Sequence, residues 1–435
     1  MSALPAAGAR LVARTTALDV AGELLSYLPP PSDDDPPVAW VRRGEGMVGW
    51  GEALRVDLAG PDRFADAARV WARVSADVAV RDDVRLPGTG PVAFVSFSFA
   101  DDSPAGGVLV VPRVVVGRRG GTSWVTAVAP EGALPAPAAP APAGAPESPG
   151  QVRFADGVRS GPQWASVVRE AVRRIGAGEV DKVVLARDLE AQADRPVDPR
   201  HLLTRLAARY PSVWTFDVDG LVGATPELLV RVERGLVTSR VLAGTIRRTG
   251  DDERDLALAG SLARSSKDLE EHEYAVRSVV EALQPYCTST SAPESPFVLH
   301  LPNVMHLATD VAGVLAAGSA SLLELGAALH PTAAVCGTPT EAAAKLIAEL
   351  EGMDRDRYAG PVGGVDARGD GELGIALRCA RLDPADPRRL RLFAGCGIVA
   401  GSDPEAELAE SDAKLVPVRD AVSPDPTPPP PPPHP

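Results

Sequence analysis

Apolar residues follow two different periods along this chain, and the two periods occur in runs. Residues 38–58 and 90–99 alternate apolar and polar positions as half-buried strands do, and residues 65–78 between them have the spacing of an amphipathic helix. Residues 109–128 continue as a predicted hairpin that turns at Gly120-Gly121.

The second part of the chain repeats this mixture without regular strand-helix alternation. Predicted helices cover residues 161–178, which stop at glycines, and then 201–210, two helices within 252–284, and 341–353. Predicted strands cover 180–192, 213–226, 228–242 and 390–399, and residues 324–339 combine a helix with a proline-bounded loop. The fold class that this order predicts is α+β.

Composition adds a connector and a tail to this picture. Residues 133–150 are rich in Pro, Ala and Gly, as flexible connectors are, and residues 421–435 end in a polyproline run that we expect to be a disordered tail. These two segments divide the rest of the chain into residues 1–132 and 151–420.

Charge and cysteine content exclude several classes of protein. The 435 residues carry a net charge of −14 with no basic stripe, which argues against a nucleic-acid partner. The four cysteines are far apart and indicate reduced thiols. Neither a signal peptide nor a membrane span is visible, so we expect a cytoplasmic protein without a membrane partner.

Two acidic pairs have the spacing of a shared helical face. Asp268 and Glu271 stand at i,i+3 in one predicted helix, and Glu407 and Glu410 repeat the arrangement near the C-terminus, with Lys414 a turn further on. Together they could provide the all-oxygen site that Mg²⁺ prefers. From spacing alone, a solvated surface is the simpler interpretation of either pair, and a salt pair to Glu410 that of Lys414. His272, beside the first pair, is interpreted as a packing residue.

Two further residues are candidates for proton transfer. Lys182 stands in an apolar strand, and burial can turn a lysine into a base, although a lysine at a strand edge that reaches solvent is the simpler interpretation. Thr225, Pro226 and Glu227 have the order of a helix start, which would explain Glu227 as a structural residue.

Anion binding has weaker signals. Gly395 to Gly397 follow a predicted strand and could present backbone N–H groups to an anion, although a tight turn is the default for such glycines. Arg378 is placed in a strand, where binding of a carboxylate competes with an ordinary ion pair.

Taken together, the motifs resemble one family. They are DKVVLAR, LVGATPELLV, VLAGTIRRT, SSKDLEEHEYAV, LPNVMHLATDVAG, LHPTAAVCGTPTEAAAKLI, YAGPVGGVDARGDGELGIALRCAR and LRLFAGCGIVAGSDPEAELAESDAKL. In this order, over residues 163–416, they closely resemble the chorismate-utilising enzymes, and specifically the isochorismate synthases. VRRGEGMVGWGEA and GPVAFVSFSF add an N-terminal resemblance. The resemblance implies two central β-sheets packed together with helices outside. It also implies that residues 1–132 are the N-terminal part and residues 151–420 the chorismate-binding catalytic region of one compact body.

The resemblance also implies roles for individual residues. Lys182 would be the base that activates water for attack at C2 of chorismate, and Glu227 the acid that protonates the leaving C4 hydroxyl. Mg²⁺ would be held by Glu271 and Glu410, assisted by Asp268 and Glu407, and would clamp the ring carboxylate. The implied substrate pocket consists of Gly244, Thr245, His330, Tyr358, Arg378, Gly395, Cys396, Gly397 and Lys414.

Sequence details distinguish the branches of this family. Relatives that use ammonia from a glutaminase typically carry Gln at the position of Lys182, so we expect water as nucleophile, no glutaminase subunit, and a monomer. Ala243 before Gly244 disfavours the aminodeoxychorismate branch. Salicylate synthase remains the main enzymatic alternative, with anthranilate synthase component I less favoured. An inactive metabolite-binding scaffold is the non-enzymatic alternative.

Cys336 and Cys396 depart from the small residues that are common at their positions in the family. The choice between menaquinone and siderophore biosynthesis is left open.

Overall fold

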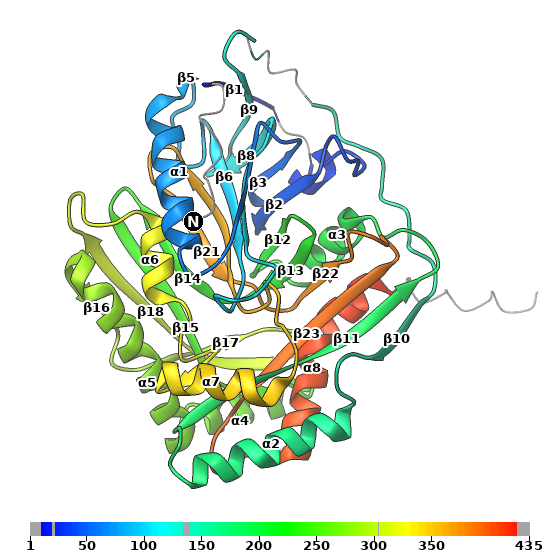
Figure 1. The fold of residues 1–435 in the computed structure, drawn as a ribbon, viewed down its shortest axis with the longest axis vertical. Coiled ribbons are helices and arrows are strands. Elements are labelled where there is room, and N and C mark those ends of the chain that lie inside the picture. The colour runs from blue at the N-terminus through cyan, green and yellow to red at the C-terminus, as the bar shows by residue number, and fades with distance from the viewer. Residues whose placement is uncertain (1–9, 20–21, 134, 136–139, 303, 424–435) are drawn as a thin grey trace, which may run out of the picture.

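We describe the fold from a computed structural model of the chain (Figure 1). The described residues are 10–19, 22–133, 135, 140–302 and 304–423, and the side chains of Lys267 and Glu271 are not among those described. The predicted tail therefore lies, from residue 424 onward, outside the described residues. The described part of the connector, from residue 140 to residue 150, has no regular secondary structure, and its Ala143 amide donates to Ser26 O at 2.7 Å.

Two large sheets form the centre of the molecule, and every strand pair in them is antiparallel except β1 with β5. Within the described residues the first sheet runs in the order β10 (Val152–Asp156), β11 (Lys182–Ala193), β23 (Arg389–Ile398), β22 (Cys379–Leu382), β13 (Leu221–Thr225), β12 (Trp214–Val218), β2 (Pro37–Arg42), β3 (Glu45–Trp50), β8 (Val114–Arg119), β9 (Thr122–Pro130), β1 (Leu11–Ala17) and β5 (Ala79–Asp82), with β19 (Gly337–Thr338) beside β11. The second runs in the order β16 (Cys287–Ser291), β18 (Val304–Leu315), β15 (Leu236–Arg247), β14 (Leu228–Glu233), β21 (Gly371–Ile375), β20 (Pro361–Asp366), β6 (Val92–Phe97), β7 (Gly107–Val111) and β4 (Leu54–Leu58), with β17 (Phe297–His300) beside β18. Strands from before and after the connector share both sheets.

Helices cover the outside of the two sheets (Figure 1). They are α1 (Arg63–Asp77), α2 (Gly161–Gly176), α3 (Pro199–Arg209), α4 (Asp252–Leu262), α5 (Ser266–Leu283), α6 (Leu322–Leu329), α7 (Thr340–Glu351) and α8 (Pro404–Val422), with short 3-10 turns at Leu24–Tyr27 and Gln284–Tyr286. Helix α5 packs on β15 and β18, α8 on β23, and α7 on β11. No helix in the described ranges is both long and apolar enough to cross a membrane.

The apolar periods of the sequence explain this packing. The main core lies between the sheets and contains Phe94 and Phe97 of β6 and Phe216 of β12, all fully buried. A second core lies under α3 and α8 on the other face of the first sheet. Helix α2 begins at a capping box in which Ser160 and Gln163 satisfy each other's backbone amides. The α+β class and the arrangement of two packed sheets with outer helices are confirmed.

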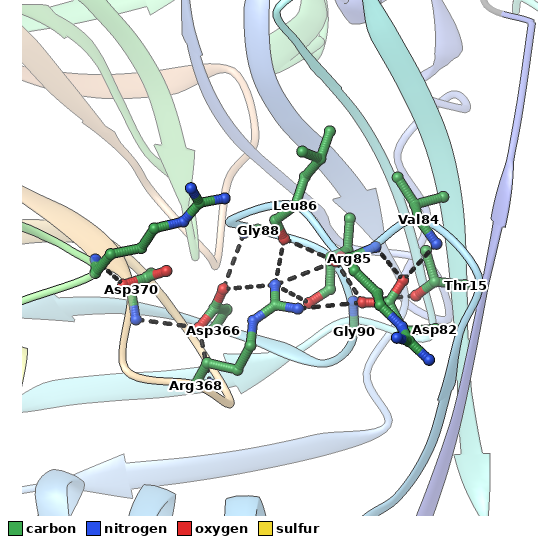
Figure 2. A network of polar contacts seen from close by, with 12 residues as sticks. Thr15, Asp82, Val84, Arg85, Leu86, Gly88, Gly90, Asp366, Arg368 and Asp370 are labelled. Atoms are coloured by element: carbon green, nitrogen blue, oxygen red, sulfur yellow. Dashed lines mark hydrogen bonds and ion pairs between the residues drawn. The ribbon is translucent and has the colours of Figure 1, made fainter.

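A polar network joins an edge of the first sheet to the second sheet (Figure 2). Asp366, at the end of β20, accepts the Gly88 amide at 2.9 Å and the Arg368 guanidinium at 3.1 Å. Arg368 also reaches Asp82, at the end of β5, at 3.2 Å. Thr89 donates to Asp82 at 2.5 Å. The network fixes the loop from residue 83 to residue 90 against the β20–β21 turn.

Candidate active site

A cavity of about 180 Å³ opens between β11 and β23 of the first sheet and β15 and β18 of the second. Most of the predicted site residues line it. Its wall includes Lys182, Glu227, Gly244, Thr245, Asp268, Tyr358, Arg378, Gly395, Gly397, Glu407, Glu410 and Lys414. Residues more than 200 positions apart in the sequence therefore meet in one polar pocket.

Lys182 is the first residue of β11 and is 8% exposed. β11 pairs along its length with β23, whose Gly397 lies opposite Val184. On its other edge Lys182 pairs with Thr338 of β19. The side chain of Lys182 enters the cavity together with that of Val184, its neighbour on the same face, so the interpretation as a lysine that reaches solvent is wrong.

Glu227 is not part of a helix, so the predicted helix start at Thr225 is wrong. Thr225 ends β13, Leu228 begins β14, and the Thr225 hydroxyl donates to Ile375 O at 2.6 Å. The apolar, β-branched residues after Glu227 pair as a strand with β21, and this pairing overrides the local capping pattern. Glu227 is 5% exposed, and burial raises its pKa to about 8, although Arg378, Lys182 and Lys414 lower it.

Arg378 stands between strands, which corrects its predicted placement in one. It lies after the end of β21 and before β22 with φ at +49°, a left-handed conformation that is uncommon outside glycine. Its side chain is 9% exposed, and within the described residues it has neither a hydrogen bond nor an ion pair. A buried guanidinium without a partner is suited to bind an anion.

The two acidic pairs approach the same cavity from different helices. Asp268 stands in the first turn of α5, and Glu407 and Glu410 stand in α8. Ligand atoms of Glu407, Glu410 and Cys396 lie within 4.8 Å of one another. Glu271 also belongs to α5, but its side chain is not among those described. Glu270 is exposed, as expected of a solvated residue.

A β-bulge shapes the wall that β15 contributes. The register between β15 and β18 shifts between Ala243 and Thr245, and Gly244 there has φ at +78°. Beyond the bulge, Thr245 Oγ1 lies 2.9 Å from Nδ1 of His306. Burial lowers the pKa of His306 well below its usual value, and Arg378 and Lys414 lower it further, which keeps the ring neutral. Sequence reasoning missed His306 although its motif had been recognised.

Three other residues do not line the cavity. His330 Nε2 lies 2.9 Å from Phe99 O, and its ring packs near Phe64 and Phe99. Cys396 points toward α8, where its thiol contacts Glu407 O at 3.4 Å. His272 lies 2.7 Å from the Thr309 hydroxyl, in agreement with a packing role.

Another cavity, of about 270 Å³, lies between β2, β12 and β21. The indoles of Trp40 and Trp214 both donate to Glu372 at 2.7 Å, and Arg119 pairs with Glu233 at 2.6 Å. Its wall has no buried lysine beside an acid of raised pKa, so we place the chemistry in the first cavity.

Comparison with known proteins agrees with this geometry. The family model described as "Chorismate binding enzyme" matches residues 35–131 and 142–423. Isochorismate synthase DhbC of Bacillus subtilis is 40% identical over 57% of this chain, and the match spans 64% of DhbC, slightly under two thirds. A candidate isochorismate synthase, MenF, of Mycobacterium tuberculosis is 37% identical over 84% of this chain and 95% of its own length.

A solved structure extends the likeness to the whole fold. The menaquinone-specific isochorismate synthase MenF of Escherichia coli superposes with a TM-score of 0.77 at 25% identity, covering 95% of each chain. The residues matched by the family model include the strands from β2 to β9 and every residue that lines the polar cavity. This chain therefore belongs to the chorismate binding enzyme family, within the group of the isochorismate synthases.

Proposed function

We propose that this protein is a Mg²⁺-dependent isomerase that converts chorismate to isochorismate in its polar cavity. The observation that carries the proposal is the meeting of Lys182 with a buried Glu227 of raised pKa in one cavity of a chorismate binding enzyme. One related isochorismate synthase is described as menaquinone-specific, and we expect the product of this protein to feed menaquinone or siderophore biosynthesis. We expect chorismate as the substrate and no glutaminase subunit, with the protein acting as a cytoplasmic monomer.

Lys182 is the proposed base. It stands on a strand that is hydrogen-bonded on both edges, so its backbone is held in place. In this role Lys182 takes a proton from water as the water oxygen bonds to C2 of the substrate ring. The water-derived hydroxyl at C2 then distinguishes the product from the amino products of ammonia-using relatives.

Glu227 is the proposed acid. Because its pKa is raised to about 8, the carboxyl group holds its proton at neutral pH and can donate it to the departing C4 hydroxyl, which leaves as water. One water enters and one leaves, so substrate and product are isomers. The protons removed by Lys182 and given by Glu227 balance over the cycle.

Arg378 is the proposed partner of a substrate carboxylate. It is the buried cavity guanidinium that lacks a bonding partner in the described part of the chain, and a bidentate pair with a carboxylate would satisfy it. Tyr358, Thr245 and the glycines of β23 would complete the wall around the ring. The left-handed backbone of Arg378 directs this side chain, and such strain is common at binding sites.

The acids of α5 and α8 fit a hard cation. Asp268, Glu407 and Glu410 all line the cavity, ligand atoms of Glu407 and Glu410 lie within 4.8 Å of each other, and oxygen ligands are what Mg²⁺ prefers. We propose that Glu271 and Glu410 bind the ion directly and that Asp268 and Glu407 assist. A bound Mg²⁺ would add positive charge for a substrate carboxylate beside the cations Lys182, Arg378 and Lys414 of the cavity wall.

A product assay tests the proposal. Purified protein with chorismate and Mg²⁺ should form isochorismate without ammonia, and removal of Mg²⁺ by a chelator should stop turnover. The variant Lys182→Ala should lose turnover while chorismate still binds. Salicylate and pyruvate as products would make the protein a salicylate synthase, and binding without turnover would favour a metabolite-binding scaffold.

A further inference from the structure

The edge of β11 that faces away from β23 has an unusual set of partners. Its first residues pair with β19, and its later residues, from Leu189 to Ala193, pair with β10. From Val184 to Ala186 no strand of the described chain lies along this edge. Backbone groups at such a gap need other partners, because buried unpaired amides and carbonyls are costly.

The four backbone groups that point away from β23 in this gap, the amides and carbonyls of Val184 and Ala186, nevertheless all have hydrogen-bond partners. The Val184 amide donates to Cys336 O at 2.8 Å, and the Val184 carbonyl accepts from Arg355 at 2.7 Å. The Ala186 amide donates to Glu351 at 2.6 Å, and the Ala186 carbonyl accepts from the Trp164 indole at 3.0 Å. Two of the four partners are thus the acid and the base of one ion pair, which takes the place of a strand.

The ion pair is completely buried. Arg355 Nη2 lies 2.5 Å from Glu351 Oε1, and Arg355 Nε lies 2.9 Å from Glu351 Oε2, with side-chain exposures of 3% and 1%. Arg355 Nη1 also donates to Val335 O at 2.9 Å, and the guanidinium lies 4.2 Å from the centre of the Phe99 ring. Arg355 also lines the cavity, but unlike that of Arg378 its guanidinium forms hydrogen bonds to Glu351, Val335 and Val184.

We infer that Arg355 is a positioning residue that, through Glu351, fixes the strand bearing Lys182 relative to the rest of the active site. The inference rests on the proposed role of Lys182 as base. Val184 is the next residue after Lys182 on the same face of β11, so a bond to its carbonyl sets where the Lys182 side chain begins. The same guanidinium also bonds to Val335 O, and Arg355 is three residues before Tyr358 in the chain. Arg355 therefore connects three segments that line the cavity, those of Val184, Val335 and Tyr358.

Only an arginine has the shape for this role. Arg355 makes four hydrogen bonds, to two carboxylate oxygens and two carbonyls, from a rigid planar fork. A lysine keeps the charge but presents its donors from a single nitrogen. Arg355→Lys should therefore stay folded while β11 loses its fixed position.

Steady-state kinetics of Arg355→Lys test the inference. We expect kcat to fall by roughly 10- to 100-fold, because small displacements of a catalytic group are that costly, while the chorismate KM stays within about threefold. The control is Lys345→Ala, which breaks an exposed pair with Glu341 at the same sequence separation within α7, the helix that ends at Glu351, and should leave kcat unchanged. An unchanged kcat in Arg355→Lys, or a rise in KM alone, would overturn the positioning role.

Hydrogen exchange separates positioning from the proposed chemistry. Amides 184–187 should exchange faster in Arg355→Lys than in the unsubstituted protein, whereas those of β15 should not change. In the unsubstituted protein the Ala186 amide should exchange as slowly as the β11 amides that bond to β23, and rapid exchange there would contradict the geometry. These readouts do not depend on turnover, so they stand even if Lys182→Ala shows that Lys182 is not the base.

A paired substitution removes the effect of a lone buried charge. Glu351→Leu combined with Arg355→Met replaces the ion pair by apolar side chains, which commonly preserves stability. If this variant melts near the unsubstituted protein, a low kcat supports positioning, and full activity refutes it. If it does not fold, the Arg355→Lys kinetics and the exchange of Ala186 decide the question.

Discussion

Lys414 Nζ lies 2.6 Å from a carboxylate oxygen of Glu410, one turn earlier in α8, and donates to Gly395 O at 3.0 Å. One ammonium group therefore links a proposed metal ligand to the glycine strand that lines the substrate cavity. The i,i+4 contact itself was expected from the sequence, but its burial was not. Lys414 is 9% exposed, so its charge acts in a poorly screened environment.

Removal of this charge should affect the metal and the substrate in opposite directions. In Lys414→Met, Glu410 loses a competing cation, so less Mg²⁺ should be needed for half-maximal activity. The cavity also loses a positive charge that faces an anionic substrate, so the chorismate KM should rise roughly tenfold, or about 1.4 kcal/mol. Titrations of Mg²⁺ and of chorismate measure the two effects.

The control Arg277→Met, which breaks an exposed i,i+4 pair with Glu273, should change neither the Mg²⁺ requirement nor the chorismate KM. A higher chorismate KM without tighter Mg²⁺ activation would show that Glu410 does not contact the metal.

The raised pKa of Glu227 predicts an alkaline limit to activity. An acid must hold its proton, and burial raises the pKa of Glu227 to about 8, so kcat/KM should fall as the pH rises through about 8. Glu227→Gln should retain chorismate binding and lose turnover. Glu233→Gln, at the other end of the same strand and paired with Arg119 near the surface, should keep the alkaline limit where it was. A profile that stays flat to pH 10 would remove Glu227 from the role of acid.

Most of the fold could be predicted because the relevant signals are local. Helix α2 ends at glycines, the α4–α5 pair falls within residues 252–284, and the β8–β9 turn is at Gly120-Gly121. The helix start at Thr225 was wrong because a capping pattern is also local, while the pairing of β14 with β21 involves residues about 140 positions away. The strand at Arg378 was wrong because no pattern marks a left-handed arginine.

The site was harder to predict from spacing alone. Asp268 and Glu410 line one cavity because α5 and α8 both border it, and only the resemblance of whole motifs predicted that they belong to one site. Glu351 and Arg355 were missed because ion pairs four residues apart are usually exposed, and because Arg355 lies beyond the end of α7. Their burial depends on the gap beside β11, which the sequence of α7 does not reveal.

The pKa of Asp217 is raised and that of Asp219 is lowered, so we expect the two residues to affect the pH dependence of stability in opposite directions. Burial raises the pKa of Asp217 to about 8, only partly offset by the Gly220 amide. An acid with a folded pKa above its unfolded value favours folding below the unfolded pKa, and this contribution is lost as the pH rises from about 4 to about 8. Asp217→Asn should therefore raise the melting temperature more at pH 8 than at pH 5.

Asp219 provides the matched comparison, in the turn that directly follows β12, the strand of Asp217. Burial alone would raise its pKa, but Arg55 at 2.8 Å and Arg357 at 2.7 Å hold it below the usual value. Its stabilising contribution is present above the unfolded pKa and is lost as the pH falls through the folded one. Asp219→Asn should lower the melting temperature at pH 8. Equal melting shifts for the two variants at both pH values would contradict the assigned charge states.

Gly395 should tolerate no side chain, because the backbone of β11 and Tyr358 approach it closely. A Cβ there would lie 3.0 Å from Leu185 O and 3.2 Å from the Tyr358 hydroxyl. Tyr358 stacks on Phe393 with the ring centres 5.2 Å apart, so it cannot move aside without losing this contact. Gly395→Ala should lower kcat/KM for chorismate by roughly 10-fold or more, since misplaced walls disturb the bound geometry. Gly401→Ala, three residues after the same strand and with open space around its Cα, should be fully active. Equal activity of the two variants, measured with melting temperatures to exclude unfolding, would show that the wall formed by Tyr358 and Gly395 does not contact the substrate.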